Sequence, residues 1–211
     1  SLWTGLGYYA RARNMHRAAQ MVVRDFHGEF PSSVGALETL PGIGRSTAGA
    51  IVTIGHDGWA PILDGNVKRV LARYLAIEGW PGKADVLAAL WAASESHTPR
   101  TRTGDYTQGI MDLGAMLCTK SNPGCLYCPM SENCRARIEN RPTDFPGKKP
   151  KKAIPVRSTV FLQCIDREGC VLLERRPPAG IWGGLWSFPE IGEKAEVADW
   201  LSNNGLSLIH I

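Results

Sequence analysis

Residues 40–48 have the sequence Leu-Pro-Gly-Ile-Gly-Arg-Ser-Thr-Ala, and the architecture predicted for the first half of the chain follows from this segment. The glycines and the proline separate two helical patterns, one ending near Leu40 and one beginning near Arg45. Either Ser32 or Ser33 is in position to cap the first helix. A turn of this kind points backbone N–H groups outward at a helix N-terminus, where they can hold a DNA phosphate without reading bases. A plain connection between two helices is the alternative interpretation.

The sequence around this turn favours a helical domain. Apolar residues recur at helical spacing from Met15 to Phe26, with arginines interleaved between them. Further helices are predicted over 45–54, 66–75, 84–94 and 106–117. No apolar run approaches the roughly 18 residues that a membrane span needs, so we expect no membrane segment.

Four of the six cysteines form one dense group, Cys118, Cys125, Cys128 and Cys134. Thiolates packed this closely suit a soft metal better than disulfides in a reducing compartment. Zinc sites usually have two C-x2–4-C pairs, whereas this group has a single C-x2-C. The spacing therefore favours a 4Fe–4S cluster, with zinc and free thiols as the alternatives.

Asp64 lies between an apolar pair and a predicted helix start, in the sequence Ile62-Leu-Asp-Gly-Asn-Val-Lys-Arg-Val70. An aspartate there commonly caps the helix. A partly buried carboxylate at the mouth of a cleft is the functional alternative. Such a group can stabilise the cationic sugar that forms when an N-glycosidic bond breaks.

The pattern changes in the last third of the chain. The formal net charge is +4, and five basic residues with no acidic one fall between 147 and 157, which indicates an exposed connector or one that runs near DNA phosphates. Strands are predicted over 159–165, 170–174 and 182–189, with a hairpin at 166–169 and a helix over 195–201. Cys164 and Cys170 are expected to be buried or half-buried.

Three segments, 6–14, 61–70 and 111–118, resemble those of adenine DNA glycosylases (the MutY family) almost residue for residue. These enzymes belong to the helix–hairpin–helix base-excision glycosylases, and the resemblance extends to about Leu201. It implies a mainly α helix–hairpin–helix glycosylase domain at 1–146, with the hairpin at about 33–55 and an iron–sulfur loop at 118–134. It further implies a basic Pro/Lys linker at 147–156 and a partial, truncated α+β Nudix-like 8-oxoguanine-recognition domain at 157–211.

The resemblance also implies roles for single residues. Asp64 corresponds to the catalytic aspartate, and Tyr8 to a tyrosine that wedges into the duplex. DNA contacts are implied at Tyr8, Gly42, Gly44, Arg45, Ser46 and Asn66. Ligands of a 4Fe–4S cluster are implied at Cys118, Cys125, Cys128 and Cys134.

The activity implied is removal of adenine mispaired with 8-oxoguanine or guanine in double-stranded DNA, by a monomer in the bacterial cytoplasm with no membrane attachment. Related glycosylase/lyases have a lysine nucleophile where this chain has Ser46, which cannot form an imine. An endonuclease III-like glycosylase/lyase acting on oxidised pyrimidines and a non-catalytic DNA-binding fragment are the alternatives. The family's general-acid glutamate corresponds to a position before Ser1, so we expect this fragment by itself to be impaired.

Overall fold

The structure is a computed structural model that describes residues 3, 7–151, 153–193 and 196–206. The chain forms two compact units, Ser1–Lys151 (unit 1) and Lys152–Ile211 (unit 2). Within the described part of the chain, no helix has the length and apolar character needed to cross a membrane.

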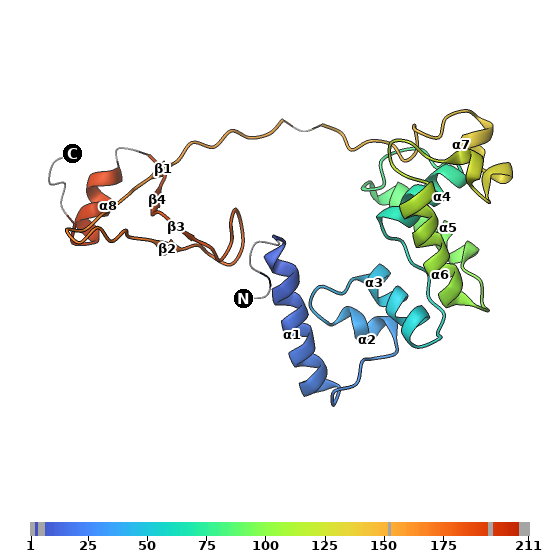
Figure 1. The fold of residues 1–211 in the computed structure, drawn as a ribbon, viewed down its shortest axis with the longest axis horizontal. Helices are drawn as coiled ribbons and strands as arrows, with labels where there is room; N and C mark the ends of the chain where they lie inside the picture. Colours follow the sequence, from blue (N-terminus) through green and yellow to red (C-terminus); the bar gives the residue numbers. More distant parts are fainter. Residues whose placement is uncertain (1–2, 4–6, 152, 194–195, 207–211) are drawn as a thin grey trace. The chain divides into compact units, whose positions relative to one another are not determined.

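Unit 1 is helical (Figure 1). Its α-helices are α1 (Tyr9–Asp25), α2 (Val34–Glu38), α3 (Arg45–Ala50), α4 (Gly65–Tyr74), α5 (Ala84–His97), α6 (Thr103–Asp112) and α7 (Arg135–Ile138). Single turns of π-helix, η1 (Ile51–Gly55) and η2 (Leu113–Leu117), extend α3 and α6, and 3-10 turns lie at η3 (Cys125–Tyr127) and η4 (Ser131–Asn133). The helices therefore follow the predicted pattern, but both of the extended ones end in π-helix, which a periodicity of apolar residues does not distinguish from α-helix.

The helix before the hairpin is capped by Ser33, because its side-chain oxygen accepts the N–H of Ala36 at 3.3 Å. The capping oxygen satisfies one of the N–H groups that a helix start leaves without an intrahelical partner. Of the two serines that the sequence offered, Ser33 is the cap.

Two groups of buried apolar side chains form the interior of unit 1. The first comes from α1, α2, α3, η1 and the loop after it: Ala18, Val22, Leu37, Leu40, Ala48, Val52 and Ala60. The second comes from 62–63 and α4 to α7: Ile62, Leu63, Val67, Val70, Leu71, Ala72, Val86, Leu90, Ala93, Ile110, Ala136 and Phe145. The spacing of the buried residues in α4 and α5 is that of one helix face, and burying each large side chain contributes about 1.5–3 kcal/mol.

Contacts of α4 organise the second group. It contacts α5, α6 and α7, which Figure 1 shows gathered around it. Val67, Val70 and Leu71 of α4 are at most 4% exposed. Because the apolar face of α4 packs into this core, its two arginines, Arg69 and Arg73, extend from another side of the helix.

The described residues of unit 2 form two short antiparallel strand pairs and one helix. Strand β1 (Val160–Phe161) pairs with β4 (Glu190–Ile191), and β2 (Glu174–Arg175) pairs with β3 (Trp186–Ser187). The helix α8 spans Val197–Asn203. The paired segments are much shorter than the predicted strands, because pairing depends on distant partners that a local pattern does not specify. Part of the prediction for the end of the chain, 207–211, lies outside the described residues.

The predicted hairpin at 166–169 is present. Ile165 bridges Val171 in antiparallel fashion, and the Asp166 carboxylate accepts the N–H groups of Glu168 and Cys170 at 2.9 and 2.7 Å. Cys170 is exposed in this turn and Cys164 is half-buried, so the expectation of burial was wrong for Cys170.

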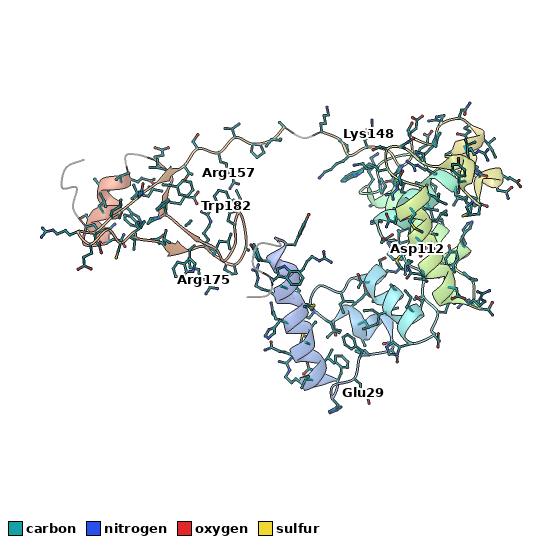
Figure 2. All side chains as sticks on the ribbon, viewed as in Figure 1. Glu29, Asp112, Lys148, Arg157, Arg175 and Trp182 are labelled. Carbon is teal, nitrogen blue, oxygen red and sulfur yellow. The ribbon has the colours of Figure 1, made fainter. Side chains whose placement is uncertain are left out.

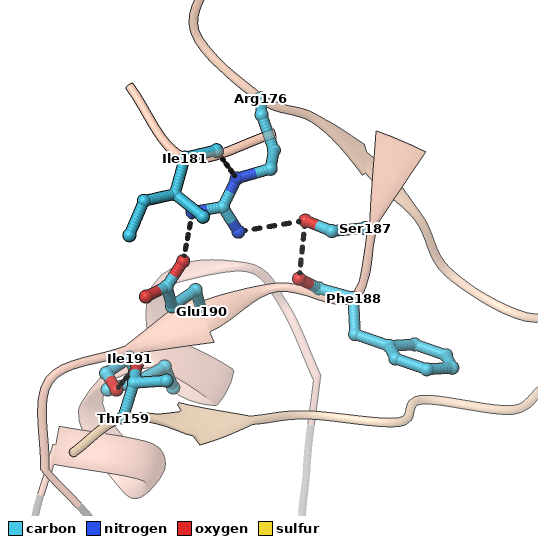
Figure 3. Close-up of polar contacts among 7 residues, drawn as sticks. All are labelled: Thr159, Arg176, Ile181, Ser187, Phe188, Glu190 and Ile191. Carbon is cyan, nitrogen blue, oxygen red and sulfur yellow. Dashed lines mark hydrogen bonds and ion pairs between the residues drawn. The ribbon is translucent and has the colours of Figure 1, made fainter. Parts of the chain in front are cut away.

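Arg176 links the two strand pairs of unit 2 (Figure 3). Its guanidinium lies 2.6 Å from the Glu190 carboxylate of β4 and donates to the carbonyl of Ile181 at 2.9 Å. It also lies 3.5 Å from the Ser187 hydroxyl of β3. The hydrogen bond from Arg176, and secondarily one from Thr159, holds the pKa of the Glu190 carboxyl below its ordinary value.

Candidate active site and cysteine loop

Asp64 caps α4 from an extended segment. Its Oδ1 accepts the N–H of Val67 at 2.7 Å, and the side chain is half-buried. The preceding Ile62 and Leu63 are 2% and 3% exposed, so the chain enters the cap from the core. Among the described residues, none donates a hydrogen bond to Oδ2 of this carboxylate. Asp64 is therefore both a helix cap, as the simpler interpretation has it, and a fixed carboxylate with one oxygen available.

The hairpin helix α3 lies against the segment that leads to Asp64. The Ser46 hydroxyl accepts the backbone N–H of Leu63 at 2.9 Å. A Cβ added at Gly49 would lie 2.7 Å from the carbonyl oxygen of Pro61, so only glycine permits this close approach. The contacts of Ser46 and Gly49 together position the backbone next to Asp64.

The turn before α3 leaves several N–H groups unpaired. Gly42 has a positive φ of 84°, which glycine adopts without strain, and its Cα faces Asn14 of α1. The backbone N–H groups of Gly44, Arg45 and Ser46 have no acceptor among the described residues. Together with the positive end of the helix dipole, such groups form a site suited to an anion.

The side chains of two residues predicted to contact DNA, Arg45 and Asn66, also contact other parts of unit 1. The guanidinium of Arg45 lies 4.0 Å from the ring centroid of Trp91 on α5, a cation–π geometry. Asn66 accepts a hydrogen bond from Arg69 at 2.8 Å, and its Cβ closely faces Gly114 of η2. Both residues thus also help to hold neighbouring elements together.

Tyr8 immediately precedes α1. It adopts a left-handed backbone conformation with φ 46° and is 79% exposed. An exposed aromatic at the tip of a helix is free to insert between bases. The structure brings Asp64, Asn66 and Ser46 to one region through the contacts above, and it gives no such contact for Tyr8.

The cysteine loop contains the four predicted ligands, Cys118, Cys125, Cys128 and Cys134. All are half-buried and unpaired, and all line one small cavity together with Arg73 and Arg137. Burial raises the pKa of the Cys125 thiol above its ordinary value, and the three neighbouring thiolates raise it further, while Arg73 opposes them. The four thiols therefore face a common space and repel one another when ionised.

Two arginines of α4 fasten this loop, and sequence reasoning missed them. Arg73 is 2% exposed and donates to Cys118 Sγ at 3.2 Å and to the carbonyls of Thr119, Lys120 and Phe145 at 2.7, 3.0 and 3.0 Å. Arg69 donates to the carbonyls of Cys118 and Gly114 at 2.7 and 2.6 Å. Arg69 and Arg73 are four residues apart on a helix whose other face is apolar, so the sequence already indicated that both side chains lie on one side of α4. Through them the helix capped by Asp64 also holds the cysteine loop.

Comparisons with known proteins match both parts of the chain. Residues 1–95 match the model of the HhH-GPD superfamily base excision DNA repair protein, and residues 160–210 match that of the NUDIX domain. An adenine DNA glycosylase from Buchnera aphidicola subsp. Schizaphis graminum is 40% identical over 98% of this chain and 59% of its own length. Adenine DNA glycosylases of Arabidopsis thaliana and Homo sapiens are 39% and 33% identical, over 93% and 90% of this chain and 34% and 43% of their own lengths.

Solved structures resemble the helical part of the fold. A thermostable thymine-DNA glycosylase superposes with a TM-score of 0.54 and 30% identity, over 61% of this chain and 59% of that chain. An endonuclease III in a non-covalent DNA complex does so with a TM-score of 0.53 and 27% identity, over 64% of this chain and 61% of that chain. The chain spans about three fifths of the length of its Buchnera relatives, 59%. With both family models matched in this order, the chain is similar to adenine DNA glycosylases over nearly its whole length, and its first 95 residues match the HhH-GPD superfamily.

Proposed function

We propose that this chain supplies the catalytic carboxylate and the DNA-gripping hairpin of an adenine DNA glycosylase. Its substrate is adenine mispaired with 8-oxoguanine or guanine in double-stranded DNA, in line with the names of its relatives. One observation carries the proposal. Asp64 is fixed by its cap bond to Val67 and keeps Oδ2 free of hydrogen bonds from the described residues.

The reaction is hydrolysis of the N-glycosidic bond. The target adenine leaves the base stack, and cleavage of its bond to C1′ leaves positive charge on the sugar. The Asp64 carboxylate stabilises that charge, with Oδ1 fixing its orientation and Oδ2 directed to the sugar. Water then completes the reaction and leaves an abasic site. The base leaves as a neutral molecule after protonation by a general acid, a role that the family resemblance assigns to a glutamate.

Ser46 makes the enzyme a glycosylase without efficient strand cleavage. A lysine at this position would attack C1′ and form an imine, whereas a hydroxyl cannot. The Ser46 hydroxyl already accepts the N–H of Leu63, next to Asp64. Its role in this proposal is to position the backbone of the catalytic residue.

The duplex is held by the hairpin and opened by an aromatic wedge. The unpaired N–H groups of Gly44, Arg45 and Ser46 bind a phosphate at the start of α3, and Gly42 forms the turn that precedes them. Tyr8 inserts beside the mispair, for which its exposure of 79% leaves it free. Asn66 lies two residues beyond Asp64 and contacts the same strand.

We also propose that Cys118, Cys125, Cys128 and Cys134 hold a 4Fe–4S cluster, which when bound cross-links the loop. Four thiolates around one zinc lie about 3.8 Å apart, because tetrahedral Zn–S bonds are about 2.3 Å long. These sulfurs are not gathered so closely. Among the described residues, the one group of three or more ligand atoms that all lie within 4.8 Å of one another is that of the exposed Asp166, Glu168 and Cys170, so no three of the four cysteine sulfurs are that close together. The wider spacing around a common cavity supports a cluster over a single zinc ion.

The proposed domains are 1–146 for glycosylase chemistry, 147–156 for the linker and 157–211 for part of an 8-oxoguanine-recognition domain. The division of the chain between Lys151 and Lys152 falls within that linker and supports this arrangement. The match of residues 160–210 to the NUDIX domain supports the proposed domain at 157–211.

An endonuclease III-like lyase is the second candidate, because an endonuclease III is among the similar structures. Duplexes carrying adenine opposite 8-oxoguanine, guanine or thymine, and one carrying thymine glycol, separate the candidates. The assay uses the complete reading frame at the length of the relatives. We expect adenine release opposite 8-oxoguanine and guanine and none opposite thymine. Cutting of the thymine-glycol strand with no adenine release would overturn the proposal.

A further inference from the structure

A cavity of about 620 Å³ lies in unit 1 beside α4, and six cations line it. They are Lys68, Arg69, Arg73, Lys120, Lys148 and Lys149, and no carboxylate lines the cavity with them. They come from α4, the cysteine loop and the beginning of the connector, segments that are far apart in the sequence. Positive groups gathered in a concave surface concentrate the potential there and attract an anion.

The cations divide into two kinds. Arg69 and Arg73 donate their N–H groups to backbone carbonyls of η2 and of the cysteine loop, which fixes the position of both guanidinium groups at the cavity. The lysines have no carboxylate partner among the described residues. Their charge is therefore available to a ligand.

The connector lysines project from a backbone that is tied to unit 1. The N–H of Gly147 donates to the carbonyl of Gly79 at 2.9 Å, and a Cβ at Gly147 would lie 2.6 Å from the Gly79 carbonyl carbon. Lys149 extends over the ring of Trp80, 5.6 Å from its centroid. Figure 2 labels Lys148 on the segment that follows α7. The first residues of the connector are thus held against unit 1 and form part of its surface.

We infer that this cavity binds the phosphate backbone of the DNA strand that carries the target nucleotide, with Lys148 and Lys149 of the connector binding phosphates. The inference rests on the proposed function. Lys68 lies one helical turn after Asp64, so a strand with its nucleotide at Asp64 passes close to the cavity. Lysines act as mobile point charges with no planar fork, which suits a continuous backbone better than one specific group.

The test is the salt dependence of duplex binding by the full-length protein. Removing one phosphate-binding lysine lowers the slope of log K against log salt by about 0.9, which is roughly eightfold in affinity at 0.1 M salt. We expect Lys148→Ala with Lys149→Ala to lower the slope by about 2, while Lys148→Arg with Lys149→Arg keeps it. Lys83→Ala is the matched control, because Lys83 is an exposed lysine of unit 1 that does not line the cavity.

Two further results distinguish a failure of the cavity's role from a failure of the proposed function. Adenine release at saturating enzyme should be unchanged in Lys83→Ala, since Lys83 is exposed and does not line the cavity. A slope equal to that of Lys83→Ala, in an enzyme that releases adenine, would overturn the role of the cavity and leave the proposed function standing. Absence of adenine release by the unmodified protein would instead overturn the proposed function.

Discussion

Asn in place of Asp64 separates the two functions of this side chain. Asn and Asp cap helices about equally well, so Asp64→Asn should keep the bond to the Val67 N–H and change the stability of unit 1 by no more than a few tenths of a kcal/mol. Asp64→Ala removes the cap and should cost about 1 kcal/mol. Both variants remove the negative charge that faces the sugar.

The expected loss in rate is much larger than the loss in stability. A preorganised group that stabilises transition-state charge contributes about 3–4 kcal/mol, or roughly a hundred- to a thousandfold in rate. We expect at least that loss in single-turnover adenine release for Asp64→Asn, with an unchanged midpoint of thermal unfolding. Asp85→Asn is the matched control, because Asp85 is exposed in the first turn of α5, away from the cap.

Two results would contradict this electrostatic role of Asp64. If Asp64→Asn released adenine within threefold of the unmodified rate, the carboxylate would have no electrostatic role. If Asp64→Asn were destabilised as much as Asp64→Ala, the change in activity would follow from damage to α4 rather than from removal of the charge.

Three further predictions concern packing, the cysteine loop and unit 2. Gly49→Ala places a methyl group 2.7 Å from the Pro61 carbonyl oxygen and should lower the free energy of unfolding by about 1–3 kcal/mol, measured by urea denaturation. Arg73→Met leaves buried carbonyls unsatisfied and should reduce bound iron per chain; an iron content equal to that of the unmodified protein would contradict this. The pKa of Glu190 is lowered mainly by Arg176, so the pair stabilises unit 2 above the ordinary carboxyl pKa, and this stabilisation disappears as pH falls through the lowered value. Glu190→Gln should flatten that acid dependence of thermal unfolding, and an unchanged profile would contradict it.

The helical elements near the hairpin were predictable because their signals are local. Glycines at 42 and 44 mark the turn, and the apolar residues of α4 recur at helical spacing after an aspartate with capping geometry. The same pattern could not identify what the polar side of α4 contacts. Arg69 and Arg73 reach residues 45 to 72 positions away in sequence, so their partners depend on the tertiary fold.

The strands of unit 2 were predicted less well for a related reason. Alternating and β-branched residues indicated a strand over 159–165, whereas the paired strand is Val160–Phe161 and Ile165 makes only a single bridge to Val171. A strand needs a partner at the right register, and that partner lies near residue 190. The turn at Asp166 was predicted correctly, because its hydrogen bonds span only a few residues.

We propose that the protein hydrolyses the glycosidic bond without a lysine nucleophile at position 46, where it has a serine. A single-turnover reaction of the full-length protein with a duplex carrying adenine opposite 8-oxoguanine tests it most directly. We expect free adenine and a strand that stays intact until alkali is added. Strand cleavage at the rate of adenine release, with the enzyme trapped on DNA by borohydride, would contradict it.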